Sequence, residues 1–220
     1  MRRQSDTGFT LIELLFAMSF VAVLLIIILS SSLAITRIYN KGITLKQVNQ
    51  SGASIGAELQ TSMREADAPL VTDYVHNGNG NGGRLCLGTY SYVWNLKDSG
   101  ANQYNGSSNR IGIVKVRDPS KSMCNGTQNV NVNEATELIL GASGTLAGVT
   151  LQLRNLDITK VANSGDNYIY QVDYTISTND QSLISATTDR CTGGSNDEFC
   201  ALNSFSFDVF LRKGGSGKID

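Results

Sequence analysis

Histidine, proline and tryptophan are scarce in this chain of 220 residues, which contains one histidine, two prolines and one tryptophan. The single histidine, His76, and the lack of any H-E-x-x-H or G-x-S-x-G motif leave no set of residues for metal-dependent or nucleophilic hydrolysis. Glu58 and Glu65 lie seven residues apart in a helical segment, and a solvated helix face explains them. We therefore expect neither enzymatic activity nor a cofactor.

Net charge is also low, because 18 Lys and Arg residues nearly balance 19 Asp and Glu residues and leave a formal charge of −1. A chain so close to neutral has no bulk electrostatic attraction to nucleic acid, and no nucleic-acid partner is predicted. The 22 glycines and the two prolines, Pro69 and Pro119, are typical of a loop-rich β domain. The Asn/Gly run 77–83 is followed by no Lys-Ser/Thr, so it indicates a flexible turn rather than a phosphate-binding loop.

The four cysteines, Cys86, Cys124, Cys191 and Cys200, contain no C-x-x-C pair, which together with the single histidine argues against a metal site. Outside the cytoplasm such cysteines are expected to form disulfides. The short loop between Cys191 and Cys200 favours that pair, which leaves Cys86 with Cys124 by exclusion. Asp189 and Asp197 lie near the cysteines and are candidate calcium ligands, although no Asp-rich calcium loop is evident.

An uncharged, mostly apolar run extends from Leu14 to Thr36. As a helix it would span about 34 Å, enough for a bilayer core of about 30 Å. Glu13 lies immediately before the run, and burying an unpaired carboxylate in lipid costs about 2.5 kcal/mol or more. A membrane anchor would be more stable without this residue, so Glu13 is a candidate functional residue.

Two ordinary explanations of the apolar run remain open. One is a cleaved secretory signal peptide, although the run is longer than a signal core; small residues from Ser30 to Ala34 offer a cleavage site. The other is a simple uncleaved membrane anchor. Neither explains Glu13.

The sequence Gly8-Phe9-Thr10-Leu11-Ile12-Glu13-Leu14-Leu15, continued by the apolar run, resembles the N-terminus of type IV prepilins and pseudopilins. The resemblance implies cleavage after Gly8 by a prepilin peptidase and N-methylation of the new terminus, Phe9. It further implies that Glu13 pairs with the N-terminal amine of a neighbouring subunit during assembly. Pairing is what a buried carboxylate requires, and it would also fix the register between subunits.

Two features depart from the simplest form of this pattern. Arg2 and Arg3 precede the apolar run, but Arg37, Lys41 and Lys46 follow it, so a count of positive charges favours the opposite membrane orientation. The run also lacks the helix-bending proline of many major pilins. The serines at 30–32 could loosen the helix instead, or the helix could be straight there.

Beyond the apolar run, apolar and small residues recur at three- and four-residue steps, which predicts an amphipathic continuation of the helix to about residue 66, before Pro69. These residues are Leu45, Val48, Gly52, Ile55, Leu59 and Ala66. Gly42, Gly52 and Gly56 weaken the helix locally, and Gly52 lies on the stripe, where it would permit close packing against a sheet. The alternative is a separate short helix after a flexible turn at Asn40–Gly42.

Period-two alternation in the second half of the chain predicts antiparallel strands with one buried face. The alternating residues begin at Tyr90, Ile111, Val149, Tyr168 and Phe205. A long helix followed by such strands gives an α+β fold, in which the amphipathic stripe covers the apolar face of an antiparallel sheet; pilins share this roll. The stripe Tyr90-Tyr92-Trp94 is interpreted as core, with a surface patch that binds a glycan or another pilin as the alternative.

The resemblance and the pattern together divide the chain into a leader (1–8), a transmembrane and assembly helix (9–37), its amphipathic continuation (38–66) and a globular β-rich head (67–220). The expected function is that of a minor pilin of a type IV pilus. It would be held first in the cytoplasmic membrane, with the head outside, and then in a surface filament. Its expected partners are other pilin subunits, the prepilin peptidase and the assembly platform. A minor pseudopilin of type II secretion or competence, a tethered adhesin that does not polymerise and a secreted enzyme remain alternatives.

Overall fold

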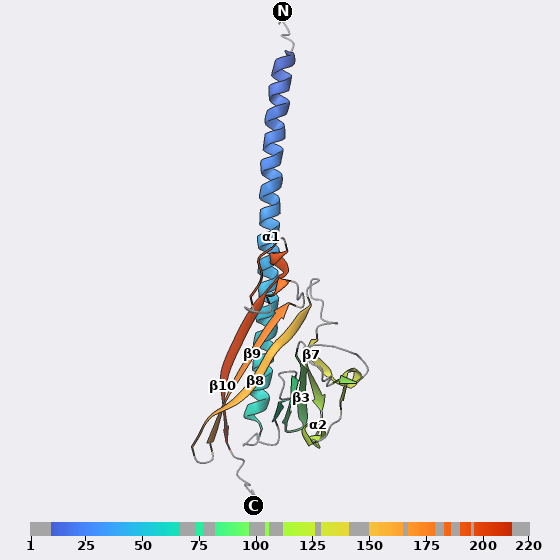
Figure 1. Ribbon diagram of the computed structural model, residues 1–220, viewed down its shortest axis with the longest axis vertical. Helices are drawn as coiled ribbons and strands as arrows, with labels where there is room; N and C mark the ends of the chain where they lie inside the picture. The colour runs from blue at the N-terminus through green and yellow to red at the C-terminus, as the bar shows by residue number, and fades with distance from the viewer. Residues whose placement is uncertain are drawn as a thin grey trace, which may run out of the picture. The chain divides into compact units, whose positions relative to one another are not determined.

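The computed structural model, drawn in Figure 1, describes residues 10–66, 74–76, 82–96, 104–105, 112–125, 129–140, 150–164, 167–178, 183–185, 190–194 and 196–212. The chain divides into two compact units, Met1–Asn40 and Lys41–Asp220. The first unit contains the N-terminal part of one long helix. The second contains the remainder of that helix and every described strand.

Helix α1 runs without interruption from Leu11 to Arg64 (blue to teal in Figure 1). No proline interrupts these 54 residues, and Arg64 in the last turn complements the negative end of the helix dipole. The prediction of one helix to about residue 66 is confirmed, and the alternative of a flexible turn at Asn40–Gly42 is wrong. The helix also continues through Ser30–Ser32.

The longer strands form two antiparallel sheets, with the orders β1-β2-β3-β5-β7 and β10-β9-β8. The larger sheet contains β1 (Tyr74–His76), β2 (Gly82–Leu87), β3 (Tyr90–Asn95), β5 (Gly112–Arg117) and β7 (Thr136–Leu140). The smaller sheet contains β8 (Leu151–Ser164), β9 (Asn167–Thr178) and β10 (Leu202–Arg212), three long strands that lie side by side in Figure 1. The shorter elements are β4 (Tyr104–Asn105), paired in parallel with β6 (Val130–Asn131), and α2 (Ser122–Asn125), η1 (Val132–Glu134) and η3 (Asp197–Phe199).

The α+β class is confirmed, but the expectation of one sheet is wrong. Strand β7 pairs with β5, whereas β8 pairs with β9, so the division between the sheets falls between β7 and β8. Alternation of apolar residues identifies a strand and its buried face but carries no information about which strand lies beside it. For that reason the sequence pattern could not separate the two sheets.

The aromatic stripe of β3 is mainly core. Tyr92 and Trp94 are fully buried, which confirms their interpretation as core residues. Tyr90, at the start of the strand, is 42% exposed, and the ammonium of Lys115 lies 4.2 Å from the centroid of its ring. The core interpretation is therefore wrong for Tyr90, whose exposed ring makes a cation–π contact instead.

The amphipathic stripe of α1 packs into the same core. Val48, Ile55 and Leu59 are buried as predicted, and so is Met63, which the stripe did not include. Leu45 is the exception, because 39% of its surface is exposed. The second half of α1 is thus held to the head by an apolar face that begins at Val48.

Close approach between α1 and the smaller sheet depends on Gly52 and Gly56. The hydroxyl of Tyr174 donates a 2.8 Å hydrogen bond to the carbonyl of Gly52, and burial raises the pKa of Tyr174 to about 12. The ring of Tyr174 stacks on Phe205 at a centroid distance of 5.1 Å. A Cβ at Gly52 would overlap the Phe205 ring, and one at Gly56 would lie 2.5 Å from the Tyr174 hydroxyl. The expectation that Gly52 permits close packing against a sheet is confirmed.

Replacing Gly52 with alanine should therefore lower the free energy of unfolding by about 1–2 kcal/mol, because displacement of Phe205 outweighs the helix propensity gained. Gly42→Ala is the matched control on the same helix, since a Cβ there meets nothing within 4 Å. It should stabilise the protein by up to about 1 kcal/mol. Urea unfolding of the full chain in detergent micelles, followed by fluorescence of the single, buried Trp94, measures both. Equal effects of the two substitutions would contradict the packing role of Gly52.

Glu58 does not lie on a solvated face, contrary to the sequence-based expectation. Its carboxylate is 2.6 Å from the Lys115 ammonium on β5 and accepts a 2.7 Å hydrogen bond from the Tyr92 hydroxyl on β3. The hydrogen bond from Lys115, followed by that from Tyr92, holds the pKa of Glu58 below its usual value. Burial raises the pKa of Tyr92 to about 12. The network links α1 to the larger sheet through residues that helical periodicity alone assigns to solvent.

Candidate functional site

The described part of the first unit exposes all of its apolar side chains. Every residue from Thr10 to Tyr39 is exposed, including Phe16, Phe20 and the run Leu24–Leu29. By length and composition this part of α1 can cross a membrane once. A surface of this kind requires lipid or other protein to cover it, because exposing so large a contiguous apolar area to water is unfavourable in free energy.

Four of the five hydroxyl groups in the apolar run donate hydrogen bonds within the helix. Ser19 donates to the carbonyl of Phe16, Ser30 and Ser31 donate to that of Ile27, and Thr36 donates to that of Ser32, all at 2.8–3.0 Å. Such bonds to carbonyls three or four residues earlier remove most of the cost of placing a hydroxyl in lipid. The serines at 30–32 are thus compatible with an uninterrupted membrane helix.

Glu13 lies in the first turn of α1, where it contacts Thr10. The Glu13 amide donates to the Thr10 hydroxyl at 3.4 Å, and that hydroxyl is 3.5 Å from the Glu13 carboxylate. Thr10-x-x-Glu13 is the sequence of a capping box, a local pattern that an assembly role for Glu13 does not require. Both distances are long, so the cap is weak. Gly8 and Phe9, the predicted cleavage and methylation residues, lie outside the described residues.

Both disulfides have the predicted pairing, Cys191–Cys200 from its short loop and Cys86–Cys124 by exclusion. Cys86 on β2 is bonded to Cys124 on α2 with a Cα–Cα distance of 6.2 Å, and Cys191 is bonded to Cys200 with a Cα–Cα distance of 5.9 Å. The described residues contain no free cysteine. The first disulfide joins the buried strand β2 to the segment that follows β5. The second joins two cysteines nine positions apart and closes a short loop just before β10.

Asp118 organises the segment that carries Cys124. Asp118 is 4% exposed, and its carboxylate accepts hydrogen bonds from the amides of Ser122 and Met123 and from the Ser91 hydroxyl, all at 2.9 Å. Burial alone raises the pKa of this carboxyl, but these donated bonds outweigh burial and hold the pKa below its usual value of 3.8. Asp118 therefore caps α2 and joins it to β3.

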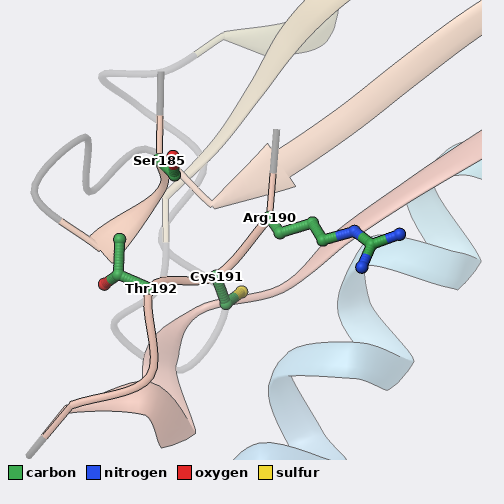
Figure 2. A pocket seen from close by; sticks show the side chains of 4 residues that line it. All are labelled: Ser185, Arg190, Cys191 and Thr192. Atoms are coloured by element: carbon green, nitrogen blue, oxygen red, sulfur yellow. The ribbon is translucent and has the colours of Figure 1, made fainter. Parts of the chain in front are cut away.

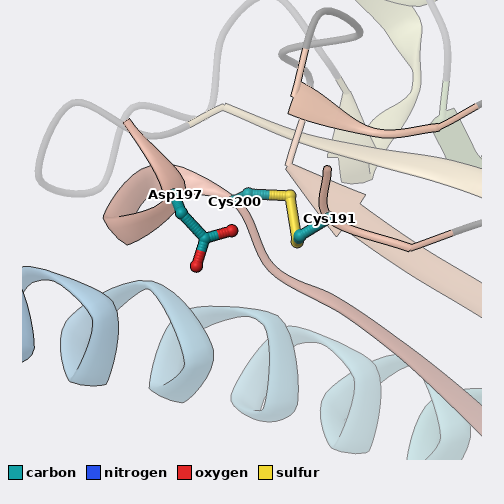
Figure 3. A group of neighbouring side chains, drawn as sticks. All are labelled: Cys191, Asp197 and Cys200. Atoms are coloured by element: carbon teal, nitrogen blue, oxygen red, sulfur yellow. A yellow bond between two sulfur atoms is a disulfide. The ribbon is translucent and has the colours of Figure 1, made fainter. Parts of the chain in front are cut away.

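Cys191, Asp197 and Cys200 come together as shown in Figure 3, with ligand atoms within 4.8 Å of one another. They do not form a metal site here, because the two sulfur atoms are bonded to each other and the Asp197 carboxylate forms an ion pair with Lys41 at 3.1 Å. The other predicted calcium candidate, Asp189, lies outside the described residues.

A shallow pocket of about 600 Å³ is lined by Ser185, Arg190, Cys191 and Thr192 (Figure 2). Cys191 is oxidised, and the side chain of Arg190 extends away from Ser185 and Thr192. These four residues supply two hydroxyls but no free thiol and no general base that could activate a hydroxyl for nucleophilic attack.

No protein-family model matches the chain, and comparison with curated proteins and with solved structures returns no significant match.

Proposed function

We propose that the chain is a filament subunit of the type IV pilin class, a minor pilin held in a membrane by the first half of α1 before assembly. The observation that carries the proposal is the N-terminal half of α1, which is apolar and exposed throughout and has one carboxylate, Glu13, in its first turn. The leader motif ending at Gly8 stands directly before it.

Glu13 acquires a role in such an assembly. Cleavage after Gly8 creates an amine at Phe9, and the amine of one subunit neutralises Glu13 of the next within a bundle of apolar helices. A buried carboxylate is tolerated when an ion pair compensates its desolvation, and the pair selects one register among the many that apolar helices allow. Lipid covers the exposed apolar residues before assembly, and neighbouring helices cover them afterwards.

The head supports this assignment. Residues from Val48 to Met63 of α1 pack against the sheets, as the proposed pilin roll requires, and two disulfides cross-link the head. Disulfides of this kind belong to an oxidising compartment, which places the head outside the cytoplasm in this proposal. The subunit then meets a prepilin peptidase and an assembly platform in the cytoplasmic membrane before it enters a surface filament or the related pseudopilus of a secretion or competence system.

A second candidate is a membrane-tethered head that does not polymerise. The contact between Thr10 and Glu13 favours it, because a capping box gives the carboxylate a local role that needs no partner subunit. The two candidates differ in the processing of the N-terminus.

Mass spectrometry of the N-terminal peptide of the protein purified from membranes tests the proposal. The expected mature chain begins at Phe9 and carries one additional methyl group. A chain that still begins at Met1, or one that begins after the small residues at 30–34, contradicts the proposal. Substitution of Gly8 by a bulky residue is the matched control, and it should preserve the uncleaved form without affecting the head.

A further inference from the structure

The ammonium group of Lys41, at the first residue of the second unit, is bound by the turn that includes η3. It donates to the carbonyl of Asp197 at 2.8 Å, to the carbonyl of Cys200 at 2.7 Å and to the Asp197 carboxylate at 3.1 Å. Three acceptors therefore match the three hydrogens of the ammonium. Charge-assisted bonds of this kind are stronger than neutral ones.

One helical turn after Lys41, the turn 197–200 makes a second contact with α1. The hydroxyl of Thr44 donates to the carbonyl of Glu198 at 3.1 Å, and Thr44 is 1% exposed. Residues three apart lie on one face of a helix, so Lys41 and Thr44 together present that face to the turn 197–200. We call this set of contacts the Lys41 clamp.

The turn depends on the disulfide between Cys191 and Cys200. The backbone of Cys191 forms an isolated antiparallel β-bridge with that of Ile184. The Thr192 amide donates a hydrogen bond to the carbonyl of Leu183, and together these contacts fix one end of the loop. The disulfide transfers that support to Cys200, whose carbonyl is one of the three acceptors for Lys41. In Figure 3 the Asp197 carboxylate points toward α1, and the disulfide lies farther from the helix.

Gly42, next to Lys41, weakens α1 at the clamp. A Cβ at this position would meet nothing within 4 Å, unlike those at Gly52 and Gly56, so packing does not require glycine here. Glycine inside a helix lowers the stability of the surrounding turns through its conformational entropy. The clamp thus holds α1 at a point where the intrinsic stability of the helix is low.

We propose that the Lys41 clamp is an oxidation-dependent lock on α1: closing the Cys191–Cys200 disulfide sets the turn that grips Lys41 and Thr44, and opening it lets the helix unwind locally at Gly42. Closure removes two electrons and two protons from the thiols of Cys191 and Cys200 and delivers them to a protein or small-molecule disulfide, which becomes a pair of thiols. The redox state of the head is thereby transmitted to the helix segment that follows the apolar run, whether or not the chain forms filaments.

Hydrogen exchange of the full-length protein in detergent micelles, followed by mass spectrometry of peptides that cover residues 41–46, tests the lock. The double variant Cys191→Ser/Cys200→Ser should exchange these amides about tenfold faster or more. Lys41→Met, which leaves the disulfide in place, should have the same effect in the same peptides. Adding Gly42→Ala to the double variant should slow the exchange about fivefold, because the higher helix propensity of alanine replaces part of the helix stability lost with the clamp.

The second disulfide provides the matched control. Cys86→Ser/Cys124→Ser should leave exchange at 41–46 unchanged, and fluorescence of the buried Trp94 shows whether each variant keeps a folded head. Equal acceleration by both double variants would mean general destabilisation and overturn the proposal. Unchanged exchange in Lys41→Met would overturn it as well, even if Cys191→Ser/Cys200→Ser fails to fold. A double variant that Gly42→Ala does not slow would refute the role of Gly42.

Discussion

Replacing Glu13 with alanine should leave the protein in the membrane but reduce its incorporation into surface filaments at least tenfold. The variant improves the apolar run as an anchor, because it removes a carboxylate that costs about 2.5 kcal/mol or more in lipid. In the proposed filament, however, it would leave the Phe9 amine of a neighbouring subunit buried without its partner, and breaking a buried ion pair costs about 3–5 kcal/mol. Immunoblots of sheared filaments and of the membrane fraction measure the ratio.

Thr10→Ala separates the two possible roles of the carboxylate. If Glu13 serves only the helix cap, the two substitutions should have similar effects, because each removes one side of the contact between Thr10 and Glu13. If Glu13 pairs with a neighbouring amine, Thr10→Ala should assemble almost normally. Normal incorporation of Glu13→Ala would rule out the assembly role of Glu13, whereas absence of the unsubstituted protein from sheared filaments would favour the tethered head.

The parts of the fold that follow from local pattern were predictable. The length of α1, the buried residues Val48, Ile55 and Leu59, and the strands at β3, β8, β9 and β10 are all encoded within short windows of sequence. Disulfide pairing followed from the short separation of Cys191 and Cys200. Strand β2 (Gly82–Leu87) was missed because all six of its residues are buried and no alternation remains to detect.

Contacts between distant segments were not predictable. Helical periodicity assigns Glu58 to solvent, but Lys115, 57 residues later, reaches it through the pairing of β3 with β5. Lys41 meets Asp197 and Cys200 more than 150 residues along the chain. Each polar side chain has many possible partners of suitable charge, and only the assembled sheets select one of them. For the candidate assembly site the situation is reversed. Its motif, Gly8–Glu13, can be identified from a short stretch of sequence, but the proposed partner of Glu13 belongs to another subunit and is therefore absent from the structure of a single chain.

Replacing Asp118 with asparagine should lower the free energy of unfolding at neutral pH by about 3 kcal/mol or more. The Asp118 carboxylate accepts bonds on both oxygens, from Ser122 on one and from Met123 and Ser91 on the other. Asparagine replaces one oxygen with an NH₂ group, which faces those donors in a site that is 4% exposed and leaves at least one buried donor without an acceptor. Urea unfolding followed by Trp94 fluorescence measures the loss.

The pH dependence of this loss identifies its cause. Because the pKa of Asp118 is lower in the folded protein than the usual 3.8, ionisation contributes stability above that value, and the contribution is lost as the pH falls through the folded pKa. The difference in unfolding free energy between the two proteins should therefore be constant from about pH 7 to about pH 5 and should shrink below about pH 4. Glu58 titrates with the same sign in both proteins, so its contribution cancels in the difference. A difference that stays constant down to the lowest pH would mean that Asp118 acts through its shape and not through its charge.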